Sequence, residues 1–125
     1  MPTPILLVDD DDDSRELLCA LLRDHGHEVY LARHGKEALS MLPSLPPRCT
    51  VLLDLNMPEM GGEQLLGALN EAALPDAYPV ILISADDRPV ETAYRNVLAR
   101  FSKPFEFAEL TRAIARANRT DSNRG

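Results

Sequence analysis

The sequence predicts a three-layer α/β domain, in which helices cover both faces of a parallel β-sheet. Apolar runs of strand type alternate along the chain with stretches whose apolar residues recur at helical spacing, which is the pattern of crossover connections. Three of these runs are continuously apolar, as expected for strands that are buried on both faces. The length of 125 residues suits a single domain with one core. We therefore expect a flavodoxin-like fold with five strands and about five helices.

The N-terminal half begins with the apolar run Ile5–Val8, which we expect to be the first strand. Five consecutive aspartates follow, and then a helix whose apolar stripe contains Leu17, Leu18, Leu21 and Leu22. Gly26 is a natural end for this helix. Glu28–Arg33 is expected to be a weaker strand, and Gly35 begins a short helix. The prolines that come next predict a stiff loop that cannot be the interior of a helix or sheet, and they are Pro43, Pro46 and Pro47.

The C-terminal half repeats the alternation of strands and helices. The expected elements are a strand at Cys49–Leu53, a helix from Gly62, a strand at Val80–Ile83, a helix from about Pro89 through Val97, a strand at Arg100–Ser102 and a last helix from Phe107. We expect the domain to span residues 1–119, and residues 120–125 to form a polar tail that frays.

Composition narrows the class of protein. The net charge of −7 and the pI near 4.8 argue against direct nucleic-acid binding, which requires a basic face. The sequence shows no apolar run of membrane-spanning length and no signal peptide, so we expect no membrane insertion and a cytoplasmic location. Cys19 and Cys49 lack metal-type spacing and are expected to be buried free thiols. The histidines are expected at the surface, and they are His25, His27 and His34.

Polar residues with possible chemistry follow four of the expected strands. These residues are Asp9 and Asp10 after the first strand, Asp54 after the third, Ser84 after the fourth and Lys103 after the fifth. Because the carboxyl ends of parallel strands meet at one edge of a sheet, these groups should converge. Carboxylates without His or Cys suit a hard cation such as Mg²⁺, and a hydroxyl and an ammonium beside a metal suit a phosphoryl group.

A carboxylate can itself be the nucleophile and form an acyl phosphate, and we take Asp54 as the reactive residue. The three aspartates of Asp11–Asp13 are expected instead to cap the following helix and oppose its dipole.

These motifs resemble those of a response-regulator receiver domain of two-component signalling, of the CheY-like kind. The matching segments are Leu7–Asp10 with Arg15 following, Leu53–Pro58 through Gly62, Ser84-Ala85 and Lys103–Phe105. The resemblance covers about Pro4 to Asn118 and implies the strand order 2-1-3-4-5.

The resemblance also implies the chemistry at the centre of the site. It makes Asp54 the acceptor of a phosphoryl group from phosphohistidine on a sensor histidine kinase or a phosphotransfer protein. Asp9, Asp10, Asp54 and the backbone carbonyl of Asn56 would hold Mg²⁺, for which Mn²⁺ could substitute. The domain would then switch conformation to control a downstream protein partner, without turning over an external substrate.

Four further residues receive roles from the same resemblance. Ser84 would contact the phosphoryl group, and the small Ala85 would leave access to it. Lys103 would pair with the phosphoryl group, and its bond to Pro104 is expected to be cis.

The expected output face departs from the family pattern. The segment from Ser84 to Lys103 is a few residues shorter than usual, and Arg100 stands where the family usually has an aromatic switch residue. Phe101 could replace that aromatic only if the register shifts. These departures put the usual switch mechanism in question.

Two other functions remain open at this point. One is a constitutive interaction domain, in which the pocket is present but phosphorylation does not control binding. The other is a Mg²⁺-dependent phosphohydrolase. Asn56 argues against the phosphohydrolase, because such enzymes usually have a second acid near the nucleophile.

Overall fold

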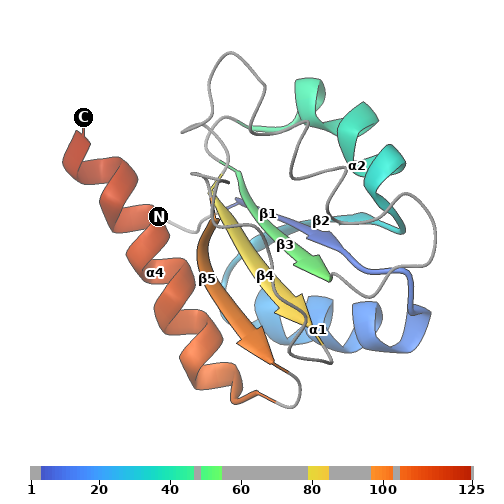
Figure 1. Ribbon diagram of the computed structural model, residues 1–125, viewed down its shortest axis with the longest axis horizontal. Coiled ribbons are helices and arrows are strands. Elements are labelled where there is room, and N and C mark those ends of the chain that lie inside the picture. Colours follow the sequence, from blue (N-terminus) through green and yellow to red (C-terminus); the bar gives the residue numbers. More distant parts are fainter. Residues whose placement is uncertain (1–3, 47–48, 55–78, 85–96, 103–104, 125) are drawn as a thin grey trace.

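The computed structural model describes residues 4–46, 49–54, 79–84, 97–102 and 105–124 (Figure 1). Its centre is a five-stranded sheet of order β2-β1-β3-β4-β5, in which every neighbouring pair is parallel. The strands are β1 (Pro4–Val8), β2 (Glu28–Ala32), β3 (Thr50–Asp54), β4 (Val80–Ser84) and β5 (Val97–Ser102). The predicted fold class and strand order are confirmed.

The start of β5 differs from the prediction. We placed Val97 at the end of a helix, whereas it belongs to β5 and pairs with Val80. The next paired residues are Ile81 and Ala99, so one extra residue is inserted in β5 at this point. This irregularity breaks the strand pattern, which is why spacing alone gave a strand that begins at Arg100.

The described residues contain three α-helices, α1 (Asp12–Asp24), α2 (Gly35–Met41) and α4 (Phe107–Arg124). Gly26 follows α1 with a φ of 91°, which confirms it as the helix stop. The predicted loop includes a 3-10 turn, η1 (Leu42–Ser44), which has Pro43 in its first turn and not in a helix interior. Proline is tolerated there because the first turn needs no intrahelical N–H.

The C-terminal helix is longer than expected. α4 runs to Arg124, so helix covers most of the segment that the sequence predicts as a polar tail. The helices expected from Gly62 and from about Pro89 lie outside the described residues.

Two apolar clusters lie on opposite faces of the sheet. α2 packs on one face with Leu6, Val8 and Leu53, while α1 and α4 cover the other face with Leu7 and Leu52 (Figure 1). Alternate residues of a strand point to opposite faces, so the continuous apolar runs supply both clusters. This arrangement forms the three predicted layers.

The two cysteines belong to different clusters. Cys49 packs on the α2 face and Cys19 on the α1 face, and both are buried free thiols, as predicted. Burial raises the pKa of the Cys49 thiol to about 12. The Cys49 thiol is therefore protonated, and it serves as a small apolar side chain.

Candidate functional site

Asp9 is fixed at the carboxyl end of β1 by its own backbone and by the turn that follows. Its N–H donates to the carbonyl oxygen of Ala32 in β2 at 3.1 Å, which continues the pairing of the two strands. Its carboxylate Oδ1 accepts a hydrogen bond from the N–H of Asp11 at 3.0 Å. Only 4% of Asp9 is exposed, so a carboxylate is held in a defined orientation inside the edge of the sheet.

Asp54 occupies the equivalent place at the end of β3. Val8 and Leu53 are partners in the parallel pair β1–β3, so the next residues lie at the same level, with Asp9 just after β1 and Asp54 as the last residue of β3. Asp54 is 5% exposed. Buried carboxylates are costly unless hydrogen bonds or cations compensate them, so two of them at one edge point to a site.

A pocket of about 330 Å³ opens beside these two carboxylates. Asp9 and Asp54 line it together with Leu7, Val8 and Ile83 from the sheet. The remaining lining residues come from α1 and from the segment that leads into α4, and they are Ser14, Leu17, Leu18, Leu21, Phe105 and Phe107. Among the described residues, the two carboxylates therefore share a pocket with mostly apolar side chains.

The apolar stripe of α1 is only partly as predicted. Leu22 is buried and Leu18 is half-buried, but Leu17 is 65% exposed and Leu21 is 37% exposed. The buried side of the helix instead includes Arg15, Cys19 and Leu22. Because the buried side of α1 is formed by these residues, Leu17 and Leu21 lie at the pocket rather than in the core.

The other predicted site residues are placed to different extents. Asp10 is exposed and directly follows Asp9, and β4 ends at Ser84, which pairs with Ser102. Asn56, Ala85, Lys103 and Pro104 lie outside the described residues. Within the described ranges, no group of three or more His, Cys, Asp or Glu side chains is arranged to hold a metal ion. The structure thus brings Asp9 and Asp54 together, and the roles of all these residues stay predictions.

The aspartates after Asp10 cap α1, as the sequence predicts. Asp11 is the N-cap, and its Oδ2 accepts a hydrogen bond from the N–H of Ser14 at 2.8 Å. Asp12 and Asp13 lie in the first turn, where negative charge opposes the positive end of the helix dipole.

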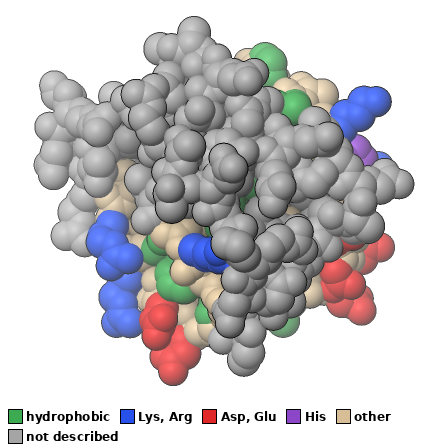
Figure 2. All heavy atoms as spheres, in the orientation of Figure 1, with side chains coloured by type: hydrophobic (Ala, Val, Ile, Leu, Met, Phe, Trp, Pro, Cys, Tyr) green, Lys and Arg blue, Asp and Glu red, His purple; other side chains and the backbone are tan. Residues whose placement is uncertain are grey.

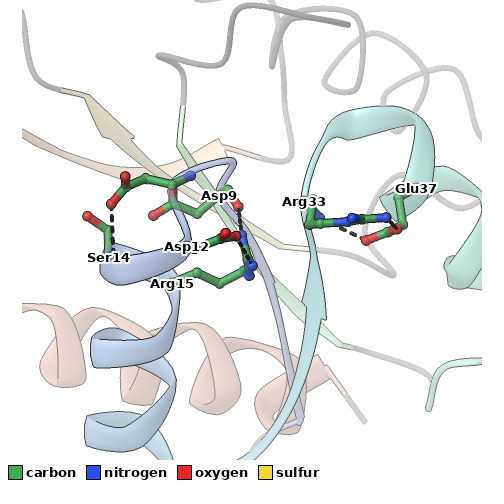
Figure 3. A network of polar contacts seen from close by, with 7 residues as sticks. Asp9, Asp12, Ser14, Arg15, Arg33 and Glu37 are labelled. Carbon is green, nitrogen blue, oxygen red and sulfur yellow. Dashed lines mark hydrogen bonds and ion pairs between the residues drawn. The ribbon is translucent and has the colours of Figure 1, made fainter.

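Arg15 is a residue whose place the sequence analysis missed. It is 9% exposed, and its Nη1 donates to the backbone carbonyl of Asp9 at 2.8 Å (Figure 3). A signal was available, since Arg15 precedes Leu18, Cys19 and Leu22 at the spacings of a buried helical stripe.

Arg100 and Phe101 lie on opposite faces of β5. Phe101 packs against the cluster under α1 and α4, and its ring centroid lies 6.0 Å from that of Phe105. Arg100 pairs with Leu82 and, by alternation, lies on the other face. The extra residue upstream in β5 determines which of its residues lie on which face of the sheet. Phe101 therefore does not share the face of Arg100.

Comparison with known families identifies the chain. The sequence model of the response regulator receiver domain matches residues 5–115. The chain belongs to this family. Receiver domains are signalling domains of two-component systems, and the fold with its paired edge aspartates agrees with that assignment.

Relatives of the receiver domain include both short and long proteins. An uncharacterized 14.6 kDa protein of Leptolyngbya boryana is 38% identical over 115 residues, which are 88% of this chain and 86% of that protein. Response regulator MprA of Mycolicibacterium vanbaalenii is 34% identical over the whole chain, which spans 55% of MprA. The chain thus covers about half of the longer relative.

Solved structures share the fold. Response regulator TrrA of Thermotoga maritima, solved in complex with Mg²⁺–BeF, has a TM-score of 0.80 and 29% identity, with 92% of this chain and 98% of TrrA covered. Chemotaxis response regulator CheY4 of Vibrio cholerae has a TM-score of 0.78 and 25% identity, with 94% and 99% covered.

The described surface of the receiver domain mixes charge types. Figure 2 shows basic and acidic side chains along the lower half of one face, with apolar side chains between them. Among the described residues, no helix has the length and apolar character needed to cross a membrane.

Proposed function

We propose that this receiver domain accepts a phosphoryl group on Asp54 in a Mg²⁺-dependent reaction and thereby controls a protein partner. The observation that carries the proposal is the pair of buried carboxylates, Asp9 and Asp54, at the ends of adjacent strands beside an open pocket. The donor is phosphohistidine on a sensor histidine kinase or a phosphotransfer protein.

The donor set fits Mg²⁺. This ion is usually held by one or two carboxylates and by phosphate oxygens, and it keeps several waters. Asp9, Asp10 and Asp54, with the backbone carbonyl of Asn56, supply such ligands, and the N–H of Asp11 orients one of them. When bound, Mg²⁺ neutralises charge that develops on the phosphoryl oxygens.

The chain's own residues carry out the transfer. A carboxylate oxygen of Asp54 attacks phosphorus, and the new O–P bond forms as the N–P bond of the donor breaks. The ring nitrogen leaves with the electron pair, and a proton from solvent makes the leaving group a neutral imidazole. The Ser84 hydroxyl donates a hydrogen bond to a phosphoryl oxygen, and Lys103 pairs with the phosphoryl charge. Ala85 is small and so leaves access to the group.

The exposed apolar residues beside the pocket suit a protein donor. Leu17 and Leu21 are exposed and line the same pocket as Asp54. Covering them would remove apolar surface from water and exclude solvent from the reacting groups. A small donor such as acetyl phosphate needs no such surface.

The test is the intact mass of the protein after incubation with acetyl phosphate, with and without Mg²⁺. We expect a phosphoryl adduct that requires Mg²⁺ in the wild-type protein and in Asp13→Asn, an exposed neighbour in the same turn. Asp54→Asn should give no adduct. A folded wild-type protein that binds Mg²⁺ but stays unlabelled, or labelling of Asp54→Asn, would contradict the proposal.

A further inference from the structure

We propose that Arg15 is a positioning residue for the metal site, because it holds the β1–α1 turn in the shape that presents Asp9 and Asp10 to the ion. The inference rests on the Mg²⁺-dependent function proposed above. It assigns a role to a buried side chain that does not itself contact the ion or the phosphoryl group.

The contacts of Arg15 tie the start of α1 to the end of β1. Nη1 donates to the carbonyl oxygen of Asp9 at 2.8 Å, and Nη2 forms an ion pair with Oδ1 of Asp12 at 2.5 Å. The backbone N–H of Arg15 donates to the carbonyl oxygen of Asp11 at 2.9 Å. Figure 3 shows the side chain reaching from the first turn of α1 back toward Asp9.

The carbonyl of Asp9 is the atom through which this contact reaches the site. It belongs to the peptide unit that joins Asp9 to Asp10, and that unit is planar. A hydrogen bond to the carbonyl therefore fixes the plane and the direction in which the chain enters Asp10. The N–H of Asp9 is held by Ala32 and its Oδ1 by Asp11, so Arg15 completes the restraint.

The residue type is unexpected for packing alone. Arg15 occupies the buried stripe of α1 with Cys19 and Leu22, where an apolar side chain would extend the core. Burying a guanidinium costs free energy unless its donors are bonded. Its planar fork can bond two acceptors at once, here a carbonyl and a carboxylate.

The positive charge of Arg15 and its proposed positioning role lead to opposite expected changes in Mg²⁺ affinity when the residue is removed. The guanidinium is positive, so as a charge alone it repels a cation, and its removal should tighten Mg²⁺ binding. If Arg15 positions the turn, its removal should weaken Mg²⁺ binding. The sign of the change therefore separates the two effects.

The experiment is calorimetric titration of the full chain with MgCl₂ at a temperature where every variant is folded by circular dichroism. The variants are Arg15→Gln and the matched control Arg23→Gln. Arg23 is on the same helix and donates to the carbonyl oxygen of Val29 in β2 at 3.1 Å, so it also ties α1 to a strand. Both variants remove one positive charge from α1.

We expect the Mg²⁺ Kd to rise about tenfold for Arg15→Gln, as for other residues that orient metal ligands, and to change little for Arg23→Gln. An unchanged or lower Kd for folded Arg15→Gln would overturn the inference. Absence of Mg²⁺ binding by the wild-type protein would instead overturn the proposed function.

A second pair of variants decides the matter if Arg15→Gln does not fold. Asp12→Asn removes the carboxylate that holds Arg15, and Asp13→Asn makes the same charge change one residue later. A larger rise in Kd for Asp12→Asn than for Asp13→Asn supports the inference. Equal values would overturn it.

Discussion

The β1–α1 and β2–α2 turns use the same capping chemistry at the same edge of the sheet. In the first, the carboxylate of Asp11 accepts the N–H of Ser14. In the second, Nδ1 of His34 accepts the N–H of Glu37 at 3.1 Å. Each turn also contains an arginine that pairs with an acid (Figure 3). Local helix initiation therefore does not distinguish the two turns.

Burial and neighbours distinguish them. The Arg15 side chain is 11% exposed and donates to the backbone of Asp9, whereas Arg33 is 67% exposed and lies 3.4 Å from Glu37. β1 lies inside the sheet next to β3 and Asp54, while β2 is at its edge. A capped turn thus becomes a candidate site where a neighbouring strand adds a second buried acid.

The largest expected difference between the turns is in phosphorylation. Asp9→Asn and Glu37→Gln each remove one carboxylate, the first from the β1–α1 turn and the second from the first turn of α2, where it bonds the β2–α2 turn. At subsaturating Mg²⁺, we expect the rate of adduct formation with acetyl phosphate to fall about tenfold or more for Asp9→Asn and to stay unchanged for Glu37→Gln. Intact mass against time measures both rates. Equal rates would remove the proposed distinction.

The next difference is in stability. Arg15→Ala leaves the buried carbonyl of Asp9 without this donor, which we expect to cost about 1–3 kcal/mol. Arg33→Ala removes an exposed pair and should change the free energy of unfolding by less than about 1 kcal/mol. Urea unfolding of both variants gives the two values, and a cost for Arg33→Ala that matched Arg15→Ala would show that burial is not decisive.

The two N-caps should differ less. Asp11→Ala loses both a cap and a charge that favours the helix N-terminus, at an expected cost of about 1 kcal/mol. His34→Ala should cost less, because α2 has only seven residues and Glu37 still accepts the N–H of Arg33 just before the helix. Thermal unfolding midpoints compare them. A larger effect of His34→Ala would reverse this ranking.

The smallest effect concerns Glu37 and pH. The N–H of Arg33 donates to its carboxylate at 2.8 Å, and this bond lowers the pKa of Glu37 in the folded chain. Its folded pKa lies below the unfolded value, so its contribution is present above the unfolded pKa and is lost as pH falls through the folded pKa. The stability difference between wild type and Glu37→Gln should therefore shrink with acidification in urea titrations. A difference that grew would contradict the assignment.

The sequence predicts the sheet well because continuous apolar runs mark its buried strands. It also predicts that Asp9 and Asp54 meet, because both follow strands at one edge of a parallel sheet. It does not predict the start of β5, where an extra residue breaks the period. It also groups Leu17 with Leu22 in one apolar stripe, because spacing alone cannot show which side of α1 faces the sheet.

The sequence did not predict the polar contacts of Arg15 and His34, for the same reason in both cases. Arginine and histidine are usually solvent-exposed, so Arg15 drew notice only as part of a motif and His34 as a surface residue. Arg15 holds the beginning of α1 to the end of β1, and His34 caps α2. Both contacts depend on how the chain turns at the edge of the sheet. Such contacts can be identified only from the three-dimensional structure.

The most direct test of the central claim is to locate the phosphoryl group. Borohydride reduces an aspartyl phosphate to homoserine, so the protein is incubated with acetyl phosphate and Mg²⁺, reduced, digested and sequenced by mass spectrometry. We predict homoserine at position 54 and at no other aspartate, and none when Mg²⁺ is left out. Homoserine within Asp9–Asp13 instead of position 54 would contradict the account, because the acceptor would then lie in the turn that we assign to the metal.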